Sequence, residues 1–457
     1  MTSLFLTLAL AFMSYSNQPN PNSNDRQLLA LMSENVSTRQ SQSSIPVSQA
    51  GAKSRQIRDM SATPSRIDIV KGIENQRNVT LSQVASDIEY INIGAHRFKP
   101  NVQMTSQGLI VSNIDGVWLY SYEGKMIKQI YKNQHDGVFG AVGYIMEKPV
   151  TGVTDVYFDE KEERLWVHYK KENDIHMTRF GYLDLAKNRI QLVSSEKKQD
   201  SVKVLASFEA ISGQINYLKD FIVYRNNKLS SHKTFATCSF QGDTLCNFTF
   251  GYDSITAKAT DGIGVDYGNY YIYRGLYTFR NSFNDTLFRV TDANKYIAEY
   301  VLDVGTSGRA TNKGNISDVH IDQMYIIQSI REDDRYLYIL FSKNYDCPAN
   351  RENGKVRFWW GLVDKTTKAF FTLPFVSDSD PDTKGFENDL DGGLPFWPKQ
   401  TGEHGEKIAQ TKGIYMKEQL TASWFSNSKA LNPQKKEKLA QFVKTLKDDD
   451  IVIIIVK

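Results

Sequence analysis

Residues 108–131 read GLIVSNIDGVWLYSYEGKMIKQIY. The apolar run 108–111 leads into 117–122, the turn Glu123-Gly124-Lys125 follows, and 126–131 returns as another strand. Two short apolar runs followed by a glycine turn and a third run are typical of neighbouring antiparallel strands. This stretch therefore predicts one antiparallel meander.

Similar units recur along the chain, starting near residues 156, 221, 270 and 336. Repeats of about 45–60 residues, each with several short strands, are typical of propeller blades. A β-sandwich is the main alternative, but a sandwich of this length would need two or three domains joined by linkers. No Gly-, Pro- or Ser-rich break interrupts residues 65–425, so one continuous ring is favoured.

The C-terminal residues are consistent with closure of such a ring. Asn432 and Pro433 can begin a helix. The run Ile451–Val456 is too apolar to lie exposed, so we expect it to pair beside an N-terminal strand in the last blade. Five meanders and this composite blade predict an all-β fold: a six-bladed β-propeller of four-stranded antiparallel blades over residues 65–457, closed by N- and C-terminal strands, with one short C-terminal helix.

The N-terminus resembles an export signal. Nine of the ten residues from Leu4 to Met13 are apolar, which is long enough for a signal peptide and too short for a membrane span. We predict a signal peptide over residues 1–16, although residues 1–3 carry no basic side chain and a buried N-terminal helix is the alternative. The following sequence resembles a bacterial lipobox, but Tyr15 stands where the lipid-bearing cysteine would be.

Residues 17–64 contain no aromatic side chain. A segment so poor in large apolar groups cannot offset its ordering entropy, so we predict a flexible tether there. Lys and Arg number 55 and Asp and Glu 52, for a net charge of +3. This balance gives no electrostatic reason to expect nucleic acid or an anionic membrane as partner, and no apolar run is long enough for a transmembrane span.

Four segments resemble exported six-bladed β-propeller proteins of Bacteroidetes-type bacteria, many of which carry lipoprotein signals. They are residues 88–91, residues 118–130, residues 284–290 and the run DLDGGLPFWP at 389–398. This resemblance covers about residues 65–457 and implies a six-bladed ring and a location in the envelope, at the periplasm or the outer membrane. It implies no settled activity, and Tyr15 departs from the lipoprotein pattern.

An acidic cluster lies near residue 385. Six carboxylates fall within 14 residues: Asp378, Asp380, Asp382, Glu387, Asp389 and Asp391. Such oxygen-rich clusters suit Ca²⁺, which makes Asp378, Asp380 and Asp382 weak metal candidates, and the alternative is a solvated acidic loop. We predict no other cofactor. Trp397 lies between two prolines after Gly392-Gly393, where it could stack on a sugar or a base, or simply fill the ring.

Two further groups of residues are candidates. Arg274, Arg280 and Asp285 could face the central funnel and bind a carboxylate or phosphate, or they could tie neighbouring blades together. Cys238 and Cys246 lie on either side of Gly242 in a predicted hairpin, and an exported protein would permit a cross-strand disulfide between them.

No nucleophile elbow, phosphate-binding glycine loop or Cys-x-x-Cys motif is present in the sequence. The export signal, the tether and the absence of these motifs together lead to the first hypothesis, a non-enzymatic binding or scaffold propeller of the envelope, with a glycan or an envelope protein as its partner. The second hypothesis is a hydrolase or lyase that uses Asp389 and Asp391, with or without Ca²⁺. It predicts that these carboxylates point into the channel, whereas capping of turns by both would count against it. A third, a subunit of a surface complex, predicts a large exposed aromatic patch.

Overall fold

The computed structural model describes residues 55–113, 115–132, 152–159, 164–170, 177–184, 203–209, 213–226, 235–239, 243–248, 268–281, 284–305, 325–343, 353–374, 384–402 and 405–457. The predicted signal peptide and most of the predicted tether lie outside these residues. Every structural statement below concerns the described part of the chain.

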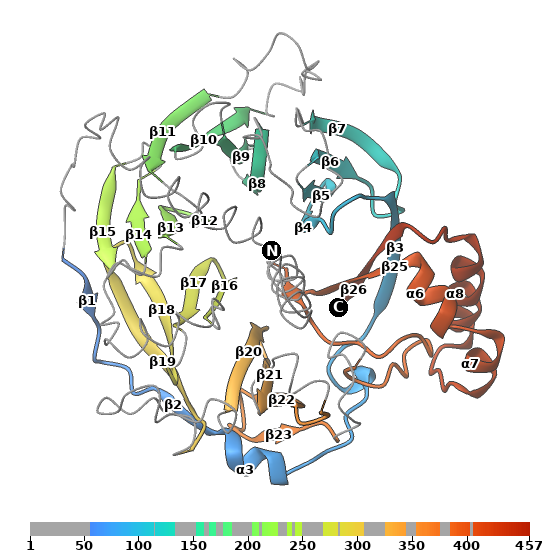
Figure 1. Ribbon diagram of the computed structural model, residues 1–457. Helices are drawn as coiled ribbons and strands as arrows, with labels where there is room; N and C mark the ends of the chain where they lie inside the picture. The colour runs from blue at the N-terminus through green and yellow to red at the C-terminus, as the bar shows by residue number, and fades with distance from the viewer. Residues whose placement is uncertain are drawn as a thin grey trace, which may run out of the picture.

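Six sheets form a ring in which the sheets radiate from the centre (Figure 1). Three of them follow one another along the chain, each with four antiparallel strands. Their strands are β4 (Asn101–Thr105), β5 (Gly108–Asn113), β6 (Gly116–Tyr120) and β7 (Met126–Lys132); β8 (Gly152–Asp159), β9 (Arg164–Lys170), β10 (Met177–Asp184) and β11 (Lys203–Glu209); and β12 (Gly213–Tyr217), β13 (Ile222–Asn226), β14 (Phe235–Cys238) and β15 (Thr244–Phe248). The meander predicted from residues 108–131 is confirmed as β5, β6 and β7.

The other three sheets complete the ring. The fourth is six-stranded, because two short N-terminal strands join its outer edge in parallel, whereas we predicted four strands in every blade. The strands are β16 (Asn269–Tyr273), β17 (Leu276–Arg280), β18 (Thr286–Asp292) and β19 (Lys295–Asp303) with β1 (Ile57–Arg58) and β2 (Ser65–Asp68); β20 (Tyr325–Glu332), β21 (Tyr336–Lys343), β22 (Arg357–Asp364) and β23 (Phe370–Thr372); and β24 (Gln400–Thr401), β25 (Lys407–Lys412), β26 (Asp450–Val456) and β3 (Ile88–Ala95).

The last sheet joins the two ends of the described chain. β26 lies between β25 and β3, with Ile454 opposite Tyr90 and Val456 opposite Ile88. All seven residues of β26 are buried, as their apolar character requires. The predicted pairing of this strand with an N-terminal strand is confirmed.

Residues 57–95 form a continuous segment along the outside of the ring, which we call the N-terminal belt (Figure 1). β1 and β2 pair with β19, and helix α3 (Ile69–Glu74) then packs against β23. This contact needs a glycine at position 72, since a Cβ there would lie 2.0 Å from Cδ1 of Phe370. The belt continues through the 3₁₀ turn η1 (Leu81–Gln83) into β3. β1 lies within residues 17–64, so sheet pairing begins before the predicted boundary at residue 65.

Polar side chains on the innermost strands connect neighbouring sheets in one direction around the ring. Asn269 donates to the carbonyl of Gln328 at 3.2 Å, and Arg331 donates to the carbonyl of Lys399. In the next two sheets the donors are the amides of Gln400, to the carbonyl of Val102 at 2.6 Å, and Gln103, to the carbonyl of Phe158 at 3.0 Å. These bonds satisfy buried carbonyls at the centre of the ring and fix the spacing of the sheets.

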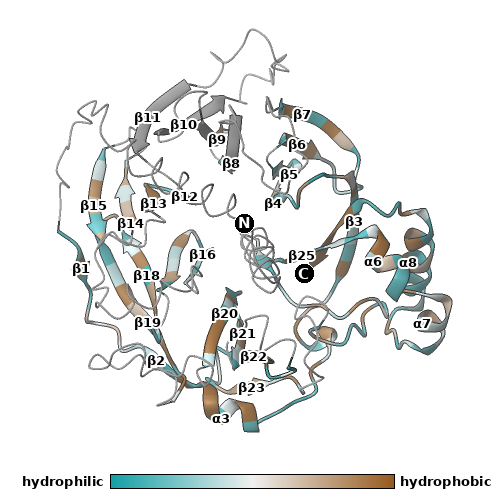
Figure 2. Ribbon diagram, viewed as in Figure 1, coloured by the Kyte–Doolittle hydropathy of each residue, from teal (hydrophilic) through white to brown (hydrophobic). Residues whose placement is uncertain are grey.

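Three helices lie outside the ring between β25 and β26: α6 (Gly413–Gln419), α7 (Ala422–Asn427) and α8 (Pro433–Thr445). The predicted C-terminal helix is α8, capped by the side chain of Asn432, but α3, α6 and α7 were not predicted. In Figure 2 the outlying α8 is mostly hydrophilic, whereas β20 within the ring is largely hydrophobic. No helix among the described residues is both long enough and apolar enough to cross a membrane.

Candidate functional site

Asp389 lies on the loop between β23 and β24 and binds the N-terminal belt. Its carboxylate accepts hydrogen bonds from the backbone N–H of Ser82 at 2.9 Å and from the hydroxyl of Ser82 at 2.5 Å. Partial burial raises the pKa of Asp389, but the hydrogen bonds from Ser82 outweigh that effect and leave the pKa below its usual value. Asp389 therefore caps the turn η1.

Asp391 is 2% exposed and also holds a turn. Its Oδ1 accepts from the backbone N–H of Gly393 at 3.0 Å, the amide of Asn388 at 2.8 Å and the hydroxyl of Tyr90 at 3.3 Å. Burial raises the pKa of Asp391 to about 6, against these hydrogen bonds. Such a raised pKa is found in general acids, but this carboxyl group is enclosed and its Oδ1 already accepts three hydrogen bonds.

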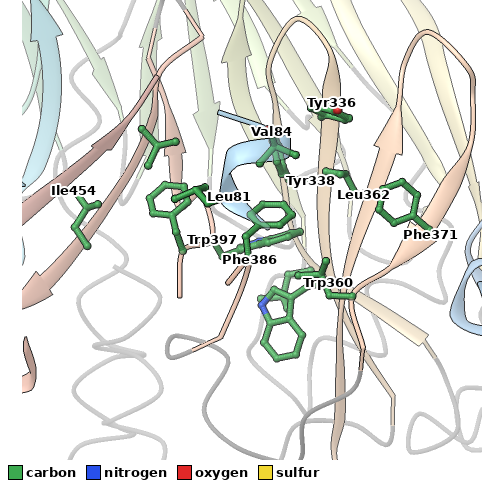
Figure 3. Packing of buried hydrophobic residues seen from close by; sticks show 14 of the residues in the cluster. Leu81, Val84, Tyr336, Tyr338, Trp360, Leu362, Phe371, Phe386, Trp397 and Ile454 are labelled. Atoms are coloured by element: carbon green, nitrogen blue, oxygen red, sulfur yellow. The ribbon is translucent and has the colours of Figure 1, made fainter. Parts of the chain in front are cut away.

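Trp397 is part of the hydrophobic core. Trp397 is 3% exposed, and its neighbours Phe386 and Tyr338 are fully buried. The centroid of its ring lies 5.2 Å from that of Phe386 and 5.7 Å from that of Tyr338 (Figure 3). A ring in this position cannot stack on a sugar or a base without opening the core. The buried ring agrees with the alternative interpretation, in which Trp397 fills the structure, and ligand binding by Trp397 stays a prediction.

The weak calcium candidates Asp378, Asp380 and Asp382 lie outside the described residues. Within the described part of the chain, no group of three or more His, Cys, Asp or Glu side chains is close enough to hold a metal ion. The neighbouring acids Asp389 and Asp391 do not form one site, because each carboxylate accepts hydrogen bonds from a different turn.

Arg274 occupies the two-residue turn between β16 and β17, with a φ of 50°. Its guanidinium pairs with Asp334 of the β20–β21 turn at 2.9 Å, and both side chains are well exposed, at 64% and 70%. The hydrogen bond from Arg274 lowers the pKa of Asp334. Arg274 thus connects two neighbouring sheets at the surface.

Arg280 is buried, with 3% of its surface exposed. It donates to the side-chain oxygen of Asn269 at 2.8 Å, and to the carbonyl oxygens of Asn284 at 2.8 Å and Ile327 at 3.1 Å. Burial lowers the pKa of Arg280 to about 10. Asp285 accepts from the hydroxyl of Thr286 at 3.0 Å, and its negative charge raises the pKa of Arg280 against the effect of burial. Arg274 is exposed and pairs with Asp334, whereas Arg280 is buried near Asp285, so the two arginines do not share one anion site.

Glu332 is the centre of a buried charge network that was not among the sites predicted from the sequence, and its side chain is fully buried. Nη2 of Arg289 donates to both oxygens of the Glu332 carboxylate, at 3.0 Å to Oε1 and at 2.9 Å to Oε2. Lys365 binds it at 2.8 Å, and the hydroxyl of Tyr271 donates to it at 2.9 Å. Burial, together with the charge of Glu332, raises the pKa of Tyr271 well above its usual value.

Asp333, the next residue, connects the turn between β20 and β21 to the last sheet, to which Lys407 belongs. Its carboxylate accepts from the hydroxyl of Tyr338 at 2.7 Å and pairs with Lys407 at 3.1 Å. Glu332, Asp333 and Asp334 are consecutive, and they bind different neighbours. A run of three acids that begins at the last residue of a β-strand was the sequence signal for this network, but it indicated neither burial nor partners.

Cys238 and Cys246 are both buried and are not joined by a disulfide, so the structure does not contain the candidate disulfide. A β-bulge separates their positions: Cys246 pairs with Thr237, and Cys238 pairs with Thr244. Thr237 and Cys238 are consecutive and point to opposite faces of the sheet, so the two thiols do not face each other. Burial raises the pKa of Cys238 to about 12, which makes it a poor nucleophile.

An apolar surface is found instead on the outer rim of the first sheet. Tyr122, Met126 and Ile127 are 36%, 53% and 54% exposed, on the turn between β6 and β7 and on the first residues of β7. They are three of seven large apolar residues exposed in the described chain. This patch is small, whereas the hypothesis of a surface-complex subunit predicts a large aromatic one.

The contacts of these side chains therefore support a structural role for the described candidate residues. The two candidate carboxylates cap turns, the tryptophan fills the core, and the arginines join neighbouring sheets. From the sequence we expected a catalytic Asp389 or Asp391 to point into the channel, and capping of turns by both to count against catalysis. Because both carboxylates cap turns, the geometry counts against catalysis by these two residues.

The family model described as a domain of unknown function (DUF4933) matches residues 49–422. The chain belongs to this family. The DUF4933 match covers five sheets completely, together with the N-terminal belt, and it ends at Ala422, the first residue of α7. No curated protein matches the chain in sequence.

Several solved structures are similar to this DUF4933 protein, to different degrees. A Bacteroides fragilis protein whose name calls it exported aligns with a TM-score of 0.50 at 10% identity, over 86% of this chain and 100% of that one. A member of the DUF4221 family from Bacteroides vulgatus aligns with a TM-score of 0.39 at 10% identity, over 82% and 97% of the two chains. Virginiamycin B lyase from Staphylococcus aureus aligns with a TM-score of 0.30 at 7% identity, over 64% and 90%.

Only the first of these similarities is strong enough to use, and at its low identity it shows the fold alone. Together with the DUF4933 match, it confirms the resemblance to propeller proteins of Bacteroides-type bacteria. The lyase similarity is too weak to support an argument about activity.

Proposed function

We propose that this chain is an exported six-bladed β-propeller that acts as a binding or scaffold module of the cell envelope. In this proposal each of the six sheets is one blade. Residues 1–16 are the signal peptide, and the part of residues 17–64 that precedes β1 is a tether that holds the ring at the periplasm or the outer membrane. The partner is a glycan or an envelope protein.

The observation that carries the proposal is the use of both candidate carboxylates as turn caps. Asp389 accepts from the backbone N–H of Ser82, and Asp391 accepts from the backbone N–H of Gly393. A catalytic acid or base must reach a substrate proton, and these groups are committed to the fold.

The test is thermal unfolding of the purified full chain with a panel of glycans, cell-wall fragments and divalent ions, with and without EDTA. A ligand at about 100 times its dissociation constant adds about 2.7 kcal/mol to the free energy of unfolding and raises the midpoint by a few degrees. We expect a glycan or wall fragment to give such a rise and to be recovered chemically unchanged.

The Asp391→Asn variant serves as the control in this test. For a binding module, it keeps the thermal shift, because Asp391 does not touch the ligand. Turnover of the ligand by the wild-type chain, lost in Asp391→Asn, would contradict the proposal and restore the hydrolase or lyase alternative. Location is tested separately, by cell fractionation and protease accessibility in the source bacterium.

A further inference from the structure

Residues 121–128, which we call the rim hairpin, expose several apolar side chains to solvent. Tyr122, Met126 and Ile127 are exposed there, next to the exposed side chain of Lys125 and the half-buried side chain of Lys128. β7 lies on the outer edge of its sheet, on the rim of the ring (Figure 1).

A β-bulge explains why two consecutive residues are exposed together. Leu119 pairs with Lys128 and Tyr120 pairs with Met126, so Ile127 is an extra residue on β7. The extra residue interrupts the alternation of the strand, and both Met126 and Ile127 then face solvent. Bulges and lysines also discourage the addition of another strand to an edge, so an extended peptide is a poor occupant for this site.

The hairpin is held rigidly against the body of the protein. Ser121 donates its backbone N–H to the carbonyl of Lys125 at 2.9 Å, and the hydroxyl of Tyr122 donates to the carbonyl of Thr105 at 2.8 Å. Gly124 has a φ of 82°, and a Cβ there would lie 2.2 Å from the carbonyl oxygen of Asn92. The exposed side chains are thus presented on an ordered turn, and little conformational entropy is lost when they bind.

The size of this surface decides between a protein and a lipid occupant. Three side chains cannot supply the roughly 800 Å² per partner that a stable protein interface buries. A bilayer needs no such area, because a few apolar side chains enter the acyl boundary and lysines attract anionic lipids. We propose that the rim hairpin is an interfacial contact for an anionic phospholipid bilayer.

Apolar insertion supplies most of this contact, and charge supplies less. Glu123 is exposed beside Lys125 and keeps a lowered pKa through its hydrogen bond with Ser121, so it stays ionised. The chain-wide charge balance is compatible with a local contact of this kind, which uses only residues of the hairpin.

The first test is sedimentation of the full chain with vesicles of phosphatidylcholine, with or without about 30% phosphatidylglycerol. We expect tighter binding to the anionic vesicles. The Met126→Ser/Ile127→Ser variant should bind about tenfold more weakly, and Lys125→Gln about fivefold more weakly. Leu431→Ser is the matched control, since Leu431 is 69% exposed on the loop before α8, and it should bind like the wild type.

The second test reads the site directly and does not depend on other apolar segments of the chain. An environment-sensitive dye is attached to Ile127→Cys or to Leu431→Cys, each in a Cys347→Ser background. Anionic vesicles should raise and blue-shift the emission at position 127 and leave position 431 unchanged. Unchanged emission at position 127, or binding by Met126→Ser/Ile127→Ser equal to that of the wild type, would overturn the proposal.

Discussion

Asp389 and Asp391 are separated by one residue, yet their carboxylates bind different parts of the protein and their pKa values are displaced in opposite directions. Asp389 caps the 3₁₀ turn of the N-terminal belt through Ser82, and its pKa is lowered. Asp391 is enclosed by Tyr90, Asn388 and Gly393, and its pKa is raised to about 6. The two acids therefore make opposite contributions to the pH dependence of stability.

Asp391→Asn is expected to stabilise the protein at pH 7. The folded pKa of about 6 exceeds the ordinary aspartate value of 3.8, so the folded state binds the proton more tightly and loses stability as pH rises between these values. This loss is on the order of 3 kcal/mol at neutral pH. Urea unfolding between pH 4 and pH 8 should show the gain of the variant at pH 7 and its disappearance near pH 4. A variant that is less stable than wild type at pH 7 would contradict the assignment.

Asp389→Ala is expected to destabilise the protein at pH 7 by about 1–2 kcal/mol, since it removes the cap of the belt turn. The folded pKa of Asp389 is lowered, so its contribution is present above the unfolded pKa and is lost as pH falls through the folded pKa. The same urea experiments measure this effect. Ser82→Ala should lower the cost of Asp389→Ala in a double-mutant cycle, and additive effects would contradict the contact.

Trp397→Ala is expected to lower the free energy of unfolding by about 3–5 kcal/mol, because it empties a site in the core beside Phe386 and Tyr338. Trp397→Phe should cost less. Denaturant unfolding followed by circular dichroism gives both values. A stable Trp397→Ala variant that lost only a ligand would show instead that the ring binds it.

Glu332→Gln is expected to destabilise the protein by about 3–5 kcal/mol, since it leaves Arg289 and Lys365 without their buried anion. Asp334→Asn is the matched control from the same turn, because its pair with Arg274 is exposed and contributes little. Equal effects of the two variants in denaturant unfolding would refute the distinction between the buried and the exposed pair.

Cys238 and Cys246 should remain unmodified by a thiol reagent in the native protein and react in urea, because both thiols are buried and reduced. A reducing agent should leave the thermal midpoint unchanged. Mass spectrometry after alkylation locates the labels, and a disulfide-linked peptide containing both residues would contradict the structure.

The sequence predicted those parts of the fold that depend on local pattern. The glycine turn at 123–125 and the alternation around it predicted β5 to β7, Asn432 and Pro433 predicted α8, and the apolar run 451–456 predicted a buried closing strand. In each case neighbouring residues alone determine the local structure or its burial.

Features that depend on distant partners were not predictable in this way. The belt strands β1 and β2 are short, and they pair with a strand more than 200 residues away. Nothing near Asp391 in the sequence shows that Tyr90 will enclose it, or that Glu332 will be buried among Arg289 and Lys365. Their chemistry depends on contacts that exist only after the ring has formed.

The N-terminal belt also determines the path of a mechanical load. A pull on the chain before Ile57 acts first on β1 and β2, where the belt runs parallel to β19. It must then detach α3 from β23 and the turn at Ser82 from Asp389 before it reaches β3. The seam between β3 and β26 therefore comes last in this series, and tension from a tethered N-terminus is taken up by two other sheets before it can open the ring.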